Sequence, residues 1–434
     1  MKRITVKMLS LLLAAIMLLG TASVAYAAGA EGTSGENGTT TTMAAEINGV
    51  EYKTMKAAVA ALKDGQTLKL LSDCTGYFAI KKANVTIDLN GHKWESTGVA
   101  VAFTIGGRSV NGYTVTVKNG TLAGGQCALR VTSNYVATDV IFDNVTLTAA
   151  NADGTKMDLQ KGARLQVSGA DEARSMVGNG FLVSLEGKTY VYGISGFNYA
   201  IDALPSEGGT VTLLDDYTSS INKALVYTED TNKPVVVDFG GHTYRNTYAY
   251  TDAVAFSILY PNANVTLTNG KIIGEGGYGI YGMLTEGYPD SSAHNLKLTL
   301  DNIEVIGEMA GYGINGTLTG NKTVIRNSTV TGNQQFGIYY PANGSLIIEN
   351  SIISGYRNGI VVKGGTIDIS GENTRISAAA AEKEPSNYYG GGSGGITAEG
   401  YAIYAEGGYN DREININISG GTFISEGVPL KKYI

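Results

Sequence analysis

Short runs of β-branched residues, each stopped by an asparagine, recur along most of this 434-residue chain. The runs read VTVKN, VIFDN, LTLDN, VIRN and LIIEN, and they stop at Asn119, Asn144, Asn302, Asn327 and Asn350. Within each group, neighbouring stops lie 23 to 25 residues apart. A strand of four or five residues cannot bury a face by itself, so it has to stack on a neighbour. A fixed period in the low twenties therefore predicts coils that stack into a solenoid.

Two further series complete each coil. One ends in glycine and reads KIIG, EVIG, TVTG and IISG, and the other reads GYGIYG, GYGING, FGIYYP, NGIVVK and YAIYAE. Asparagine tolerates the left-handed backbone of a turn, and glycine allows sharper corners. The pattern predicts an all-β chain folded as a right-handed parallel β-helix solenoid. A β-sandwich or a tandem of small β domains is the competing fold, but neither explains a fixed period with the same residue at each corner.

A longer duplication lies over the coils. Residues 47–91 and 187–241 each read as a short strand, an amphipathic helix, a glycine turn and a strand of the type TLKLL or TVTLL. We interpret this unit as a cap, because a bare end of a solenoid would expose unpaired strand edges. Two caps predict two tandem modules, a first β-helix module at 46–187 and a second at 188–434. The second carries a Gly-rich loop at 378–400.

The first 45 residues have the pattern of an export signal and a leader. Lys2, Arg3 and Lys7 precede the apolar run Met8–Gly20, and Ala-Tyr-Ala then ends at Ala27. This pattern predicts a signal peptide at 1–27 and a secreted protein, extracellular or associated with the cell surface. The alternative is an uncleaved anchor, for which the apolar run is short. Residues 28–45 are rich in Gly and Thr and predict a flexible leader.

One stretch resembles a known family. Residues 52–92, with DGQTLKLLSD and VTIDLNGH, are similar to the start of pectate-lyase-like right-handed parallel β-helix domains of extracellular proteins from Gram-positive gut bacteria. The closing INISGGTF at 416–423 resembles the last coils of the same domains. The resemblance covers essentially the whole mature chain and implies the fold. It implies no particular activity, because that superfamily includes lyases, hydrolases, adhesins and phage tailspikes.

The residues that a polysaccharide-cleaving enzyme needs do not cluster in the sequence. The one Asp-Asp pair, Asp215-Asp216, follows a capping strand, and the Gly-His pairs at His92 and His242 take matching places in both modules. Both features indicate structural turns rather than the paired acids of glycoside hydrolysis. Other carboxylates, such as Asp88, are spread along the repeats rather than gathered around a metal or a base. We therefore predict no catalytic residue, no metal ligand and no cofactor, and we keep a polysaccharide lyase or glycoside hydrolase acting on acidic polysaccharide as the alternative.

Tyrosine dominates the aromatic residues, with 27 against 9 Phe and 1 Trp. In the third series the isoleucine should point inward and the next residue outward, because strand residues alternate between faces. This predicts an outward column of Tyr281, Asn315, Tyr339 and Tyr404, in which rings could stack on sugars and an amide could bind hydroxyls. The alternative is that these tyrosines only pack on one another.

Charge and cysteine content limit the partners. The net charge of -7 disfavours nucleic acid and anionic membranes, and no later segment could insert into a membrane once the signal is removed. Cys74 and Cys127 are too few for a disulfide scaffold, and unpaired thiols are favoured over one bridge.

We expect a monomeric, non-catalytic adhesin-type protein that binds polysaccharide or a cell-surface glycan. A passive structural stalk is a further alternative.

Overall fold

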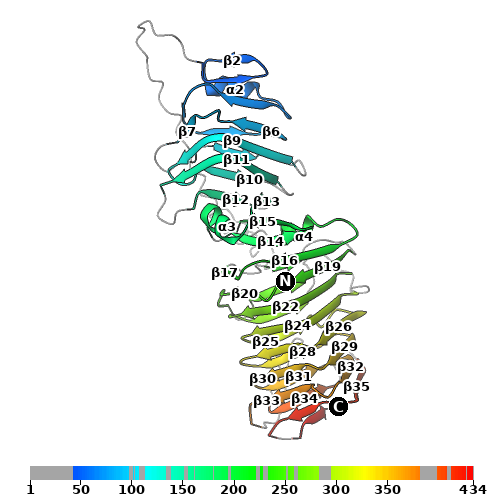
Figure 1. Ribbon diagram of the computed structural model, residues 1–434. Helices are drawn as coiled ribbons and strands as arrows, with labels where there is room; N and C mark the ends of the chain where they lie inside the picture. Colours follow the sequence, from blue (N-terminus) through cyan, green and yellow to red (C-terminus); the bar gives the residue numbers. More distant parts are fainter. Residues whose placement is uncertain are drawn as a thin grey trace, which may run out of the picture. The chain divides into compact units, whose positions relative to one another are not determined.

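The protein is described by a computed structural model (Figure 1). It covers residues 43–434 apart from 97–100, 102, 107–112, 133–137, 151–154, 161, 179, 194–196, 221–224, 228–232, 251–252, 259–261, 283–294, 382–397, 408–411, 427 and 434. The predicted signal peptide, nearly all of the leader and most of the Gly-rich loop lie outside these residues.

The first module begins with a hairpin and a short helix, followed by stacked coils. The hairpin and helix are β1 (Ala45–Ile47), β2 (Val50–Tyr52) and α2 (Met55–Ala61). Its strands are β3 (Thr67–Leu70), β4 (Cys74–Thr75), β5 (Phe78–Ile80), β6 (Val85–Asp88), β7 (Lys93–Glu95), β8 (Phe103–Gly106), β9 (Tyr113–Gly124), β10 (Leu129–Thr132), β11 (Thr138–Ala149), β12 (Met157–Gln160) and β13 (Ala163–Gln166). Helix α3 (Ala170–Val177) follows the last of them.

The second module repeats this order and is longer. It starts with the hairpin β14 (Phe181–Leu185) and β15 (Lys188–Tyr192) and with α4 (Phe197–Asp202). Its first coils are β16 (Gly209–Leu213), β17 (Tyr217–Ser219), β18 (Leu225–Tyr227), β19 (Pro234–Asp238), β20 (Thr243–Asn246), β21 (Val254–Ile258), β22 (Asn264–Gly274), β23 (Tyr278–Gly282), β24 (Lys297–Gly307) and β25 (Ala310–Ile314). Its last coils are β26 (Asn321–Arg326), β27 (Thr329–Gly332), β28 (Phe336–Tyr340), β29 (Gly344–Glu349), β30 (Ile352–Gly355), β31 (Asn358–Val362), β32 (Gly365–Ser370), β33 (Arg375–Ala378), β34 (Tyr401–Glu406), β35 (Ile414–Ile418), β36 (Thr422–Ile424) and β37 (Leu430–Tyr433).

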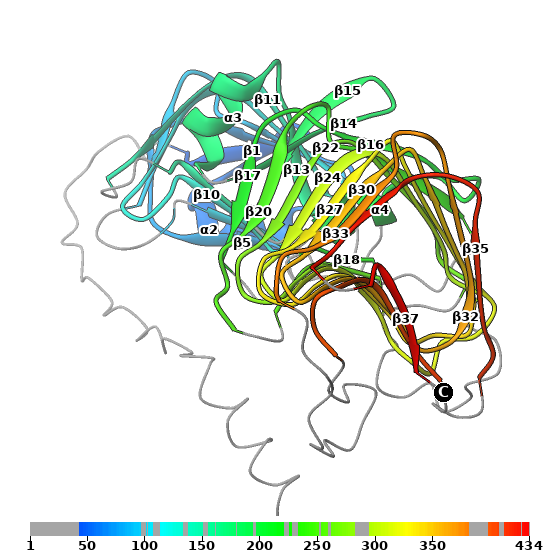
Figure 2. The same ribbon diagram turned by 90° about the horizontal axis from the view of Figure 1, so that it is seen from below.

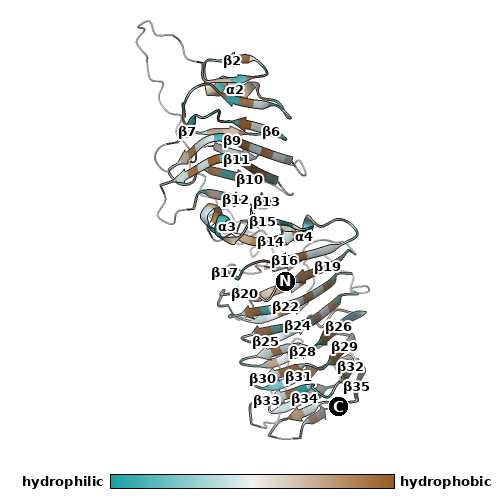
Figure 3. Ribbon diagram, in the orientation of Figure 1, coloured by the Kyte–Doolittle hydropathy of each residue, from teal (hydrophilic) through white to brown (hydrophobic). Residues whose placement is uncertain are grey.

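Strands of consecutive coils pair in parallel and in register, so the predicted parallel β-helix is confirmed. One inward column runs through Leu267, Leu300, Ile325, Ile348 and Ile369, and all five side chains are buried. Hydrophobic and polar residues alternate along these strands, which Figure 3 shows as alternating brown and teal. Seen along the stack, the strands lie over one another (Figure 2).

The asparagine stops form one corner of the coil. Asn119, Asn302, Asn327 and the other stops have positive φ angles, for example 54° at Asn302 and 51° at Asn327, as their position at left-handed turns predicts. Their amides also connect coils. Asn302 Nδ2 donates to Asn269 Oδ1 at 3.0 Å, and Asn327 Nδ2 donates to Asp301 Oδ1 at 3.2 Å. The column is thus mixed, with aspartate taking the acceptor role at some coils.

Glycines form the next corner on most coils, because the carbonyl that follows the turn leaves no room for a side chain. Gly307, Gly332 and Gly355 stack in register, and Ala378 takes the same place one coil later. A Cβ atom at Gly332 would collide with the carbonyl oxygen of Phe336, and the other glycines meet equivalent carbonyls. On the coils that carry glycine here, the chain must therefore turn without a side chain in order to start the third strand.

Gly332→Ala is predicted to destabilise the second module by about 2–3 kcal/mol, because the new methyl group has to displace backbone. The matched change Ala378→Gly, in the same column, should shift stability far less. Urea unfolding followed by circular dichroism measures both. Equal midpoints for the two variants would contradict the close approach described above.

A two-stranded hairpin separates two hydrophobic cores. On β14, Phe181 and Val183 belong to the core of the second module and Leu182 to that of the first, and Val191 of β15 also faces the first core. β15 pairs antiparallel with β13, and β14 pairs antiparallel with β16. The predicted module boundary at 187/188 falls in the turn of this hairpin. The hairpin is apolar on both faces because each face closes a different core.

The first hairpin differs in this respect. Ala45 and Ile47 of β1 are buried in the first core, whereas Glu46 lies opposite Glu51 on the other face. Two like charges directly across a strand pair disfavour the addition of another sheet or coil on that face. This hairpin therefore covers a core on one side only, as the predicted cap should.

Both cysteines are free and buried, as the sequence favours. Burial raises the pKa of Cys74 and of Cys127 to about 11, because the thiolate would lose its hydration.

The native protein is therefore predicted to give no fast thiol reaction with Ellman's reagent at pH 8, where both thiols are protonated. Reactivity should rise only as the pH approaches 11. In denaturant, two thiols per chain should react at once. One or two fast thiols in the native state would show that the coils around these residues open readily.

Candidate functional site

The outer face of one sheet carries most of the aromatic side chains that sequence reasoning singled out. This sheet consists of β18, β21, β23, β25, β28, β31, β34 and β37, and we call it the third sheet. Two outward positions per strand recur through it. The first runs through Tyr278, Ala310, Phe336, Asn358 and Tyr401, and the second through Tyr281, Gly313, Tyr339, Val361 and Tyr404.

Asn315 does not belong to this column, so that part of the prediction is wrong. The position beside Tyr281 is Gly313, and Tyr312 rather than Ile314 stands in line with the inward isoleucines. The reason is a close approach at Gly311, where a Cβ atom would meet Val330 Cγ1 at 2.5 Å. Gly279, Gly337 and Gly359 make similar approaches on other coils, and this glycine column sets the register.

The expectation of an exposed ladder is also wrong for two of its members. Tyr339 is 6% exposed and Tyr404 is 1% exposed. They form a small apolar cluster with Val361, Ala398 and Tyr401 on the outside of the third sheet. Rings sealed in this way cannot stack on a ligand from solvent.

An ion pair lies beside this cluster. The Lys363 ammonium, whose residue is 3% exposed, contacts a carboxylate oxygen of Glu406 at 2.8 Å and lies 6.0 Å from the centre of the Tyr339 ring. Asn358 Nδ2 donates to the carbonyl of Ala398, and Tyr401 N donates to Asn358 Oδ1. These contacts anchor the end of the Gly-rich insertion on the sheet.

Further up the stack the aromatic rings are partly open. Tyr278 and Tyr281 of β23 lie 4.6 Å apart at ring centroids, and Phe336 of β28 stacks on Tyr339 at 5.7 Å. Tyr278, Tyr281 and Phe336 are all half-buried. Burial raises the pKa of the Tyr278 hydroxyl, so this ring stays neutral at physiological pH. Sequence reasoning missed Tyr278 and Phe336, because each precedes a predicted ring by three residues, a spacing that regular strand alternation assigns to opposite faces.

Polar groups lie at the corner where the strands of the third sheet begin. The Glu308 carboxylate accepts from Asn333 Nδ2 at 3.1 Å and from Gln334 Nε2 at 2.6 Å. Tyr250 and Tyr356 are exposed on the same kind of corner in other coils. Half-open rings flanked by amides and a carboxylate form a surface suited to polyhydroxylated ligands.

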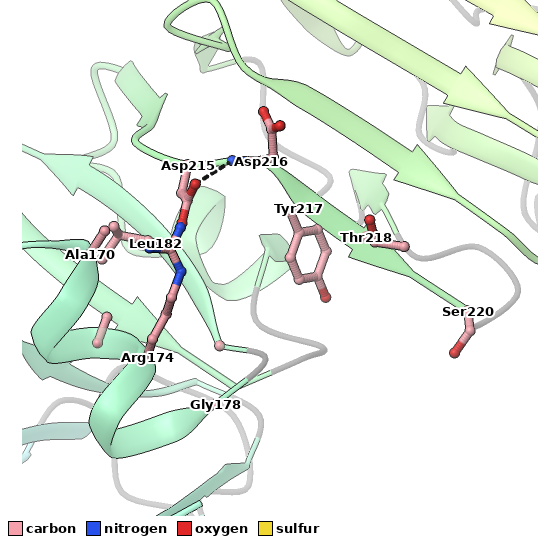
Figure 4. A pocket seen from close by; sticks show the side chains of 11 residues that line it. Ala170, Arg174, Gly178, Leu182, Asp215, Asp216, Tyr217, Thr218 and Ser220 are labelled. Carbon is pink, nitrogen blue, oxygen red and sulfur yellow. Dashed lines mark hydrogen bonds and ion pairs between the residues drawn. The ribbon is translucent and has the colours of Figure 1, made fainter. Parts of the chain in front are cut away.

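A second candidate is the pocket of about 610 Å³ beside the hairpin that separates the two cores (Figure 4). Arg174 reaches from α3 and pairs with Asp215, and its guanidinium also lies 3.6 Å from Asp171. The pocket is also lined by small residues of α3, by Leu182 and Tyr217, and by Thr218 and Ser220. Asp216 also lines it.

The Asp-Asp pair in this pocket has structural partners. Asp216 Oδ1 accepts from the backbone N–H of Thr243 at 2.8 Å and lies 3.5 Å from His242 Nδ1. Asp73 repeats this arrangement in the first module, where the N–H of Lys93 and then the His92 ring lower the pKa of its carboxyl. The two Asp-His contacts tie neighbouring coils together, which agrees with the structural role predicted for the Gly-His pairs.

The rest of the described chain offers no site for a metal ion and no membrane-spanning helix. Among the residues that the structure describes, no group of three or more His, Cys, Asp or Glu side chains could hold a metal ion. No helix in the same residues is long and apolar enough to cross a membrane. Comparison with models of protein families and with curated proteins finds no match.

Arg174→Ala is predicted to lower the free energy of unfolding by less than about 1 kcal/mol, because exposed ion pairs contribute little. Arg245→Ala, which removes an exposed pair with Glu275 inside the second module, is the matched control. Both should shift the urea midpoint equally little. A much larger loss for Arg174→Ala would show that the two modules depend on this ion pair for their joining.

Proposed function

We propose that this chain is a non-catalytic extracellular β-helix that binds glycan in the manner of an adhesin, at the cell surface or after secretion. The observation that carries the proposal is the half-open aromatic surface of Tyr278, Tyr281 and Phe336 on the third sheet. We call these three rings the aromatic face. Its partner would be a polysaccharide or a cell-surface glycan.

The chemistry of the aromatic face supports this reading. Tyrosine and phenylalanine rings offer flat apolar surface for the C–H groups of a sugar, and their packing against the sheet limits the entropy lost on binding. The neighbouring amides of Asn333 and Gln334 are exposed and can donate to or accept from hydroxyls. The resemblance to pectate-lyase-like domains is consistent with a polysaccharide ligand and adds no residue to the site.

A polysaccharide lyase or glycoside hydrolase remains the second candidate. The pocket beside α3 favours it, because two carboxylates and an arginine meet there. Against it, Asp215 is already paired with Arg174 and Asp216 with a backbone N–H and His242. A passive stalk is the third candidate and needs neither site.

A glycan array with the purified chain tests the proposal, and binding is expected to persist in EDTA. Tyr281→Ala should weaken binding to the best glycan about tenfold, equivalent to about 1.4 kcal/mol. Tyr77→Ala removes an exposed ring of the first module and serves as the control.

The outcomes separate the candidates. Release of reducing sugar or of unsaturated products from a bound polysaccharide would favour the enzyme. No binding and no product on any glycan would leave the stalk. Equal losses for Tyr281→Ala and Tyr77→Ala would place the binding surface elsewhere.

A further inference from the structure

Large and small residues alternate from coil to coil on the outside of the third sheet. β23 carries the ring pair Tyr278 and Tyr281, whereas the same two places on β25 hold Ala310 and Gly313. The ring pair returns on β28 and on β34, and β31 between them again carries smaller side chains. The pairs in question are Phe336–Tyr339, Asn358–Val361 and Tyr401–Tyr404.

Packing enforces this alternation. A Cβ atom at Gly313 would lie 2.7 Å from Tyr278 Cε1 and 2.8 Å from Tyr281 Cδ2. The rings of β23 therefore spread over the next coil and occupy the space that its side chains would need. A ring pair on β25 would therefore collide with that of β23, and on β31 the smaller Asn358 and Val361 take the same two places, so ring pairs recur on every second coil.

The alternation fixes a distance along the stack. Neighbouring parallel strands lie roughly 4.8 Å apart, so ring pairs on every second coil recur at roughly 9.6 Å. That is close to the length of two sugar units in an extended polysaccharide. In a polysaccharide whose successive sugar rings are rotated by about half a turn, every second sugar ring presents the same face in the same direction.

We propose that the ligand of the aromatic face is an extended, neutral, β-1,4-linked polysaccharide that runs along the stack of coils, with two sugars two units apart stacked on the rings of β23 and on Phe336 of β28. This inference rests on the glycan-binding function proposed above and names its substrate class. A chain that coils, such as an α-1,4-linked glucan, cannot keep equivalent faces on rigid ring pairs at this spacing.

Charge selects a neutral chain over an acidic one. On the coil between the open rings of β23 and Phe336 of β28, the corner carries Glu308, whose two hydrogen-bond donors are the uncharged amides of Asn333 and Gln334. The net charge of the whole chain is also negative. Uronic acid carboxylates would meet repulsion at this corner, while the hydroxyls of a neutral sugar can bind the carboxylate and the amides.

The number of open ring positions sets the length of oligosaccharide that is recognised. The pair on β23 and Phe336 on β28 are half-buried, whereas Tyr401 and Tyr404 of the third pair are buried. The open rings of β23 and Phe336 of β28 lie two sugars apart, so three sugars bridge them. Affinity should therefore rise from the disaccharide to the trisaccharide and tetrasaccharide and change little beyond that.

Isothermal titration with soluble oligosaccharides tests the inference on the full mature chain. The β-1,4-linked series of glucose, xylose and N-acetylglucosamine, two to six units long, are compared with α-1,4-linked glucose and galacturonic acid oligomers of the same lengths. The affinity for at least one β-1,4-linked series should rise tenfold or more between two and four units. The α-1,4-linked series should bind at least tenfold more weakly at six units.

Two variants connect this behaviour with the ring pairs. Tyr281→Ala and Phe336→Ala should each reduce the affinity for the six-unit oligosaccharide to that for the two-unit oligosaccharide. Tyr77→Ala should leave the dependence of affinity on length unchanged. Urea midpoints within the error of the unchanged protein show that the variants remain folded. Should Phe336→Ala fail to fold, Phe336→Leu, which keeps the apolar volume without the ring, takes its place.

The outcomes distinguish a failure of this inference from a failure of the proposed glycan-binding function. Binding of array glycans without binding of any β-1,4 series would overturn this inference and leave the proposed function standing. The same holds if affinity does not depend on length, or if the α-1,4-linked oligomers bind equally well. Absence of binding on the array and in every titration would overturn both.

Discussion

The parallel hydrogen-bonded ladder between coils is the constraint on which the rest of this structure depends. A coil contains strands of mostly three to six residues, so it has almost no interior of its own until neighbouring coils cover it. In-register pairing then dictates what each position can hold. Positions that point inward stack into columns such as Leu267 to Ile369, and corners accept only residues with unusual backbone or no side chain.

The hairpin β14–β15 shows what happens where this ladder is interrupted. β13 and β16 are not paired with each other; the antiparallel hairpin stands between them. Each open end of the ladder exposes strand edges and a hydrophobic core. A two-stranded hairpin pairs with the strand edges of both ends, and it covers both cores when its two faces are apolar. Leu182 and Phe181, adjacent in sequence, are buried in different cores for this reason.

The sequence predicted the solenoid and its corners because corners depend on backbone geometry, which few residues satisfy. It failed on the register of β25, because the letters GYGI occur at both Gly277 and Gly311 and suggest the same alignment. Register is set instead by where glycine is needed against Val330. Counting from the asparagine stop does not decide between the two alignments, because Ile280 and Ile338 lie 11 residues beyond their stops, whereas Tyr312 and Ile314 lie 10 and 12 beyond Asn302.

Exposure of the outward tyrosines could not be predicted, because it depends on what packs over the sheet from elsewhere in the chain. Alternation along a strand says only that Tyr281, Tyr339 and Tyr404 leave the interior of the coil. Ala398, more than thirty residues beyond Val361, then packs with Tyr339 and Tyr404. The ion pair of Arg174 and Asp215, beside the hairpin that separates the two cores, could not be predicted for the same reason, since 41 residues separate its partners.

One outward column thus serves two physical purposes. Near β34 its rings are buried with Ala398 and add to the stability of the module, whereas near β23 and β28 the same kind of ring keeps an open side. The difference lies in the covering segment and not in the residue type. Because the rings are already fixed against Gly313 and Tyr339, a ligand that meets them would not have to order them first, and rigid aromatic surface of this kind favours binding.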